Sequence, residues 1–209
     1  QRAVSGPEHP STVEGMRRLA DVLGSAGRIE EARVIQTTTL EILHRILPPE
    51  HPLLARAMQS LATTLKTQGR YGDAEPLQAR ALEVFRAAFP SDHQSTATAL
   101  NNLANVRHDL RDLEGALTLH HESLAMKRRL FGDDHPGLAD SYNNIAAVLF
   151  DRMDMEGALA YYQRTLEHDR RTLGEDHPWI GPDLVAVGSV HGRLGRLEEA
   201  EELMRRAVA

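Results

Sequence analysis

Five histidines of this chain recur at a fixed step of 42 residues, each directly after an acidic residue and usually before a proline. The five blocks are Glu8-His9-Pro10, Glu50-His51-Pro52, Asp92-His93-Gln94, Asp134-His135-Pro136 and Asp176-His177-Pro178. Histidines could ligate a metal ion if several of them lay within a few ångströms of it. A fixed step of this length instead indicates a stacked repeat, in which successive units lie roughly 10 Å apart. We therefore predict no metal site and no cofactor, and we assign the periodic histidines to loop-to-helix junctions.

Outside these blocks, His120 and His121 are adjacent in the sequence. Neighbouring side chains on a helix point about 100° apart, so the pair is a poor chelate and we interpret it as a surface pair. The chain has no glycine-rich phosphate loop, no nucleophile elbow and no His-Glu-x-x-His element. The sequence therefore predicts a protein that is not an enzyme.

The elements that carry these blocks follow a helical pattern. In the second block Met58, Leu61, Ala62 and Leu65 fall at i, i+3, i+4 and i+7, the spacing of one helix face. A second amphipathic segment follows in each repeat, headed by an alanine: Ala32, Ala74, Ala116, Ala158 and Ala200. The pattern predicts an all-α, right-handed superhelical solenoid of five helix-turn-helix repeats. The expected repeats are about 9–50, 51–92, 93–134, 135–176 and 177–209, in one domain over 1–209 that is a fragment of a larger protein.

The turn between the two segments carries a glycine in three repeats, Gly27, Gly69 and Gly195, whereas the other two have Arg111 and Met153. We expect this turn to be closed differently where the glycine is missing. Asp112 and Asp154, which come next, are predicted to cap the second helix.

Composition narrows the classes of partner. The 209 residues include 24 Lys and Arg against 30 Asp and Glu, a formal charge of −6, and no cysteine. No basic stripe is present, which argues against a nucleic-acid partner. No apolar run approaches the ~20 residues of a membrane span, and no signal peptide is visible. We predict a cytoplasmic protein with neither a nucleic-acid nor a membrane partner.

Several columns of the repeat carry a resemblance. They are Leu19-Ala20, Leu61-Ala62, Leu103-Ala104 and Ile145-Ala146, together with Asn101-Asn102 and Gly132-Asp133-Asp134-His135-Pro136. Over its whole length the chain resembles a tetratricopeptide repeat array of the kinesin light-chain type, with a period of 42 in place of the usual 34. The Arg- and Ala-rich, Lys-poor composition favours a bacterial source.

The resemblance implies that the first helices line a concave groove that binds an extended peptide, with the groove-facing columns beside the Leu-Ala pair. The residues in those columns are Arg17, Gln59, Thr63, Asn101, Asn102, Asn105, Asn143 and Asn144. We also expect the charged residues Arg56 and Asp140 to lie along the same groove. An asparagine amide offers both a donor and an acceptor, so it can pair with both backbone groups of a peptide. Alternatively, the amides form a ladder between adjacent helices.

We interpret the chain as a protein–protein interaction scaffold that holds a protein or peptide segment. The alternatives are a regulatory or sensory domain of a bacterial signalling protein, such as a kinase or a nucleotide-switch ATPase, and a peptide-signal receptor module. The last segment ends in an apolar ridge that includes Leu197, Leu203 and Val208. We expect the chain either to fray in repeat five or to self-associate end to end through this C-terminal face.

Overall fold

The computed structural model describes residues 9–208, and all regular structure in that range is helical. The helices are α1 (Pro10–Ser25), α2 (Ile29–Ile46), α3 (Pro52–Thr67), α4 (Tyr71–Ala88), α5 (Gln94–Asp109), α6 (Leu113–Phe131), α7 (Gly137–Asp151), α8 (Met155–Leu173), α9 (Ile180–Arg193) and α10 (Leu197–Ala207). Within the described residues they pair into five helix-turn-helix repeats. The predicted all-α solenoid of five repeats is confirmed.

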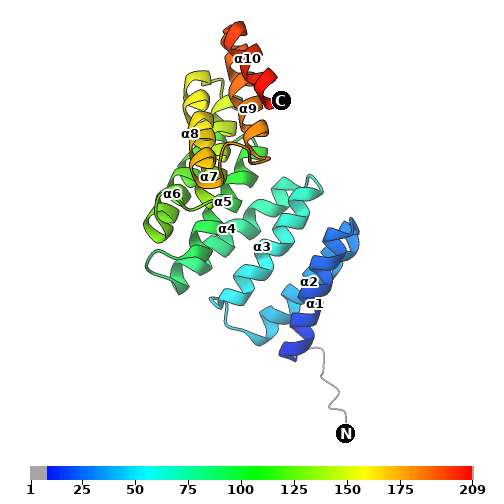
Figure 1. Cartoon of the computed structure of the whole chain (residues 1–209). Coiled ribbons are helices and arrows are strands. Elements are labelled where there is room, and N and C mark those ends of the chain that lie inside the picture. The colour runs from blue at the N-terminus through cyan, green and yellow to red at the C-terminus, as the bar shows by residue number, and fades with distance from the viewer. Residues whose placement is uncertain (1–8, 209) are drawn as a thin grey trace. The chain divides into compact units, whose positions relative to one another are not determined.

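The chain forms two compact units, one ending at Ser91 and the other beginning at Asp92. The first unit holds α1 to α4, blue to blue-green in Figure 1, and the second holds α5 to α10, green to red. Inside each unit consecutive helices pack on one another. None of the described helices combines the length and the apolarity that crossing a membrane requires.

Small side chains allow the two helices of a repeat to approach closely. Ala32, Ala74, Ala116 and Ala158, one column of the repeat, have no exposed surface. The larger core side chains come from the predicted apolar faces, among them Leu61 and Leu65 in the first unit and Ile145 in the second. The 42-residue periodicity therefore places both the alanine contacts and the aliphatic core.

Each periodic histidine lies at the loop-to-helix junction of its repeat, and His9, His51 and His93 are the N-caps of α1, α3 and α5. The ring Nδ1 atoms of His9, His51, His93, His135 and His177 accept hydrogen bonds from the backbone N–H two residues later, at 3.1 to 3.3 Å. This bond satisfies one of the N–H groups that a helix leaves unpaired at its start. The junction role predicted for these histidines is confirmed.

The turn inside each repeat has one backbone geometry with or without glycine. Gly27, Gly69 and Gly195 have φ angles of 75°, 72° and 76°, and Arg111 and Met153 have φ angles of 68° and 67°. The expectation of a differently closed turn is therefore wrong, because two residues with a Cβ adopt the same left-handed conformation.

The caps that follow this turn come in two forms. The Asp112 and Asp154 carboxylates accept from the N–H groups of Gly115 and Gly157 at 3.0 Å, which confirms the predicted caps. A Cβ at Gly115 would lie 2.1 Å from Asp112 Oδ2, so this cap depends on the glycine. In the first two repeats an arginine at the same place pairs with an acid three residues later instead, as Arg28 does with a carboxylate oxygen of Glu31 at 2.6 Å.

Replacing Met153 by glycine is expected to stabilise the second unit. The left-handed conformation costs a residue with a Cβ about 1–2 kcal/mol, and part of the gain is offset by the greater freedom of glycine in the unfolded chain. Met153 is 71% exposed, so little packing is lost. We expect the free energy of unfolding in urea to rise by about 1 kcal/mol. The control Met153→Ala keeps the Cβ and should not raise it; equal stabilisation by both variants would contradict the strain argument.

Candidate peptide-binding site

A cavity of about 330 Å³ lies between α1, α2 and α3 in the first unit. Arg17 reaches it from α1, and Leu53 and Arg56 reach it from α3. The second helix of the repeat also contributes to its lining. Its residues there are Gln36, Thr39, Leu43 and Ile46, followed by Leu47 just after the helix.

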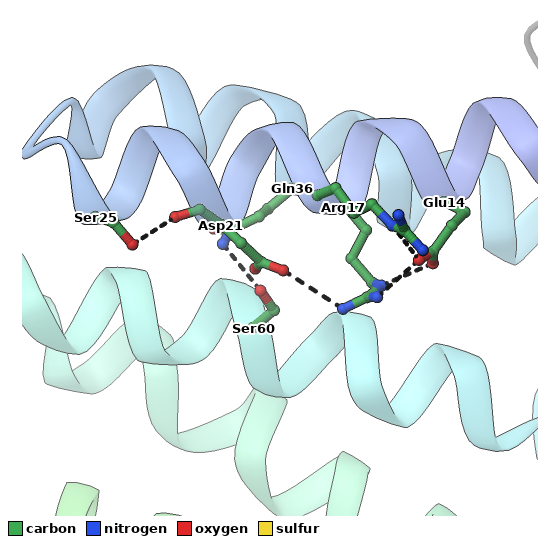
Figure 2. A network of polar contacts seen from close by, with 7 residues as sticks. Glu14, Arg17, Asp21, Ser25, Gln36 and Ser60 are labelled. Carbon is green, nitrogen blue, oxygen red and sulfur yellow. Dashed lines mark hydrogen bonds and ion pairs between the residues drawn. The ribbon is translucent and has the colours of Figure 1, made fainter.

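A polar network on α1 fixes the direction of Arg17 (Figure 2). Its Nε donates to a carboxylate oxygen of Glu14 at 3.0 Å, and one of its terminal nitrogens donates to Asp21 Oδ2 at 3.4 Å. Figure 2 shows the guanidinium held between these two carboxylates on the side of α1 that faces α3. Hydrogen bonds from Arg17 and Arg18 lower the pKa of Glu14 to about 2. The two carboxylates therefore hold the guanidinium of Arg17 in place at the edge of the cavity.

The opposite rim carries a second cation. Arg56 is exposed and makes no ion pair with any residue in the described range 9–208. Between the two arginines Gln36 Nε2 donates to Ser60 Oγ at 2.9 Å, whereas the buried Gln36 Oε1 has no hydrogen-bond partner among the described residues. The cavity therefore offers two guanidinium groups, one of them bonded to the Glu14 carboxylate of the same lining, beside aliphatic side chains. That combination suits an apolar side chain next to a carboxylate.

The predicted asparagines lie in the second unit, on α5 and α7, and they divide into two kinds. Asn144 Nδ2 donates to Asn101 Oδ1 at 3.0 Å, so one rung of the alternative amide ladder is present. Asn102 and Asn105 are half-buried, and their amides make no hydrogen bond with other described residues. These two amides remain available to a ligand.

The other predicted residues are more scattered. Gln59 and Thr63 lie on α3 outside the cavity lining, and Thr63 Oγ1 donates to the backbone oxygen of Gln59 at 2.9 Å. Asp140 and Asn143 are exposed on α7. Of the ten predicted residues, the structure brings Arg17 and Arg56 together at one cavity and joins Asn101 to Asn144. Sequence reasoning missed the contribution of α2, since it considered first helices alone.

Comparison with a family model identifies the family of the chain. The family model described as "Tetratricopeptide repeat" matches residues 12–87, 95–151 and 138–209. The chain belongs to the tetratricopeptide repeat family. A search among curated protein sequences found no match.

Several solved tetratricopeptide arrays share the fold. A putative kinesin light chain from Podosopora anserina has a TM-score of 0.85 at 20% identity, over 96% of this chain and 95% of that one. BtubC (BKLC) from P. vanneervenii has a TM-score of 0.81 at 26% identity, over 94% of this chain and 78% of that one. A Rap protein complexed with competence and sporulation factor has a TM-score of 0.76 at 13% identity, over 100% of this chain and 55% of that one. The resemblance to arrays of the kinesin light-chain type is confirmed.

The tetratricopeptide array differs from expectation at His120, which is 1% exposed rather than part of a surface pair. His121, one position on, is exposed. His120 lies 42 residues after Gln78 and 84 after Gln36, and both glutamines are buried. Because a repeat position keeps its burial from one unit to the next, that column is the signal from which the burial of His120 could have been predicted.

The last helix of the array, α10, and the residue after it expose apolar side chains to solvent. Leu197 is 69% exposed and Val208 is 86% exposed, while Leu203 packs partly against the core of the second unit. Self-association through this face stays a prediction.

Proposed function

We propose that this tetratricopeptide array is a non-catalytic scaffold, acting in the cytoplasm, that binds an extended peptide segment of a partner protein. The observation that carries the proposal is the cavity of the first unit, where Arg17 and Arg56 flank an aliphatic lining. An acidic side chain of the peptide would pair with the arginines, and a neighbouring apolar side chain would enter the cavity. In the second unit, taken by itself, the amides of Asn102 and Asn105 would bond the backbone of an extended peptide.

Loss of the Arg56 guanidinium tests this proposal. We expect peptides selected from a random displayed library to carry an acidic residue beside an apolar one. Arg56→Ala should weaken the selected peptide about tenfold or more, because a hydrogen bond to a charged group contributes about 1.5–3 kcal/mol. Titration of the labelled peptide into each variant by fluorescence anisotropy gives the affinities.

The control is Arg18→Ala, which removes another exposed arginine that bonds Glu14 from outside the cavity. It should leave the affinity nearly unchanged. Equal affinities for the Arg56 variant and wild type would overturn the cavity as the binding site.

A second candidate is a regulatory or sensory array of a bacterial signalling protein, or a receptor for a peptide signal. Its support is the likeness to a Rap protein solved with competence and sporulation factor. The cavity and the amides would serve both candidates, and the selected peptide separates them. A sequence encoded in a kinase or an ATPase favours regulation, whereas a secreted short peptide favours reception.

A further inference from the structure

Polar side chains occupy core positions in the fourth repeat. His168 lies at the column of Ile42, Val84 and Met126, and all four side chains are buried. Asp169, also buried, lies at the column of Leu43 and Phe85, which in the third repeat holds the half-buried Lys127. Burying polar groups where a repeat normally has aliphatic ones costs free energy unless they are bonded. This substitution therefore needs an explanation beyond packing.

The bonding of His168 is incomplete. Its Nδ1 lies 3.2 Å from Asp169 Oδ1, and the Tyr142 ring approaches edge-on with the ring centres 6.3 Å apart. The Nε2 atom is buried and has no hydrogen-bond partner in the described part of the chain. A carboxylate accepts only, so the ring donates through Nδ1 and leaves Nε2 to meet something else.

Beside His168 lies a cavity of about 410 Å³ formed by α6, α7, α8 and the loop after α6. Three arginines line it, Arg128, Arg164 and Arg171, against two carboxylates, Asp133 and Glu167. The lining is therefore net positive in a chain whose overall charge is −6.

The three arginines differ in how they are engaged. Arg164 makes no ion pair with a described residue, and its guanidinium lies 5.0 Å from the centre of the Tyr161 ring. Arg128 pairs with Asp133 at 2.6 Å and Arg171 pairs with Asp134 at 2.9 Å. Those pairs are solvent-exposed, and exposed ion pairs contribute little free energy to folding. A doubly charged ligand can therefore compete with the carboxylates for both arginines.

We propose that this cavity binds the phosphoryl group of a phosphate monoester, held by Arg128, Arg164 and Arg171 and by His168 through Nε2. With Asp169 accepting from Nδ1, Nε2 donates to the phosphoryl group when the ring carries both protons. The cavity volume exceeds that of a phosphate ion and leaves room for the group that carries it. The site uses helices of the second unit alone and does not depend on the peptide cavity of the first.

The test is isothermal titration of the 209-residue chain with inorganic phosphate and with a phosphoserine peptide, beside the unphosphorylated peptide. Arg164→Gln is expected to weaken phosphate binding at least tenfold, and Glu167→Gln is expected to strengthen it several-fold because a repelling charge is lost. Arg129→Gln, on α6 and bonded to Asp92 outside the cavity, is the matched control and should change nothing. Tighter binding of the phosphopeptide than of inorganic phosphate assigns the ligand to a phosphorylated side chain; equal binding assigns it to a free phosphate compound.

Titration with sulfate tests the role of His168 separately, since sulfate stays fully ionised near neutral pH and brings no proton of its own. Weaker sulfate binding by His168→Gln than by wild type supports the assignment, and equal binding by the two overturns the role of His168. No saturable phosphate binding, or equal binding by wild type and Arg164→Gln, overturns the site.

Discussion

Replacing His120 by glutamine is expected to reduce the loss of unfolding free energy on acidification of the second unit by about 3 kcal/mol. His120 is buried on α6, and burial lowers the pKa of its imidazole to about 4, with smaller contributions from His108, Lys127 and His121. The folded chain thus holds a neutral ring that the unfolded chain protonates near pH 6.5.

The sign follows from that difference. Above pH 6.5 the ring is neutral in both states, and its contribution to stability is fully present. Between pH 6.5 and about 4 the unfolded chain binds the extra proton, so this contribution falls by about 1.4 kcal/mol per pH unit. Asp183 opposes the trend, because burial and the nearby Asp169 raise the pKa of its carboxyl to about 6, which favours the folded state as the pH falls through that value.

The measurement is the difference in unfolding free energy between wild type and His120→Gln from pH 7.5 to pH 4. Glutamine suits the column, since Gln36 and Gln78 occupy it in the first two repeats. Asp183 is present in both chains and cancels. His44→Gln, which changes an exposed histidine of α2, is the control and should follow the wild-type profile. Parallel profiles for wild type and His120→Gln would show that the buried ring is protonated without cost.

Most of the fold could be predicted because the repeat has no insertions. Every core position is sampled several times, so a column such as Ala32, Ala74, Ala116 and Ala158 reveals burial even without coordinates. Backbone strain escapes this reasoning. The change from glycine to Met153 is compatible with a new turn or with the old turn held under strain, and only the φ angle of 67° decides between them.

The candidate site was predictable in part for a related reason. Arg17 lies in a column that the family resemblance assigns to the groove, and Arg56 was expected among the charged residues along it. The structure places both at one cavity. The contribution of Leu43 and Ile46 comes from the second helix, where apolar residues read as ordinary core. A role for His168 could not be predicted from the sequence, because it depends on a cavity formed by three helices and a loop.

Asparagines of the second unit are expected to separate binding from stability. Asn144→Ala removes the hydrogen bond to Asn101 and leaves Oδ1 of the half-buried Asn101 unpaired. This loss should lower the unfolding free energy by about 0.5–1.5 kcal/mol. Asn102→Ala removes an amide that has no partner among the described residues, so its stability should stay near that of wild type. If a peptide occupies this face, Asn102→Ala should weaken it by about 1–3 kcal/mol, roughly five- to 150-fold, because a polar group of the peptide is left buried and unpaired.

The two readouts are urea unfolding and anisotropy titration with the peptide selected on the wild-type chain. Asn143→Ala is the control for helix propensity in the stability measurement, since the same exchange is made at an exposed position of α7, the helix that carries Asn144. Asparagine is the poorer helix former, so each variant gains a few tenths of a kcal/mol that the control measures and removes. A loss of stability in Asn102→Ala with unchanged peptide affinity would assign all of these amides to the ladder and contradict peptide binding through them.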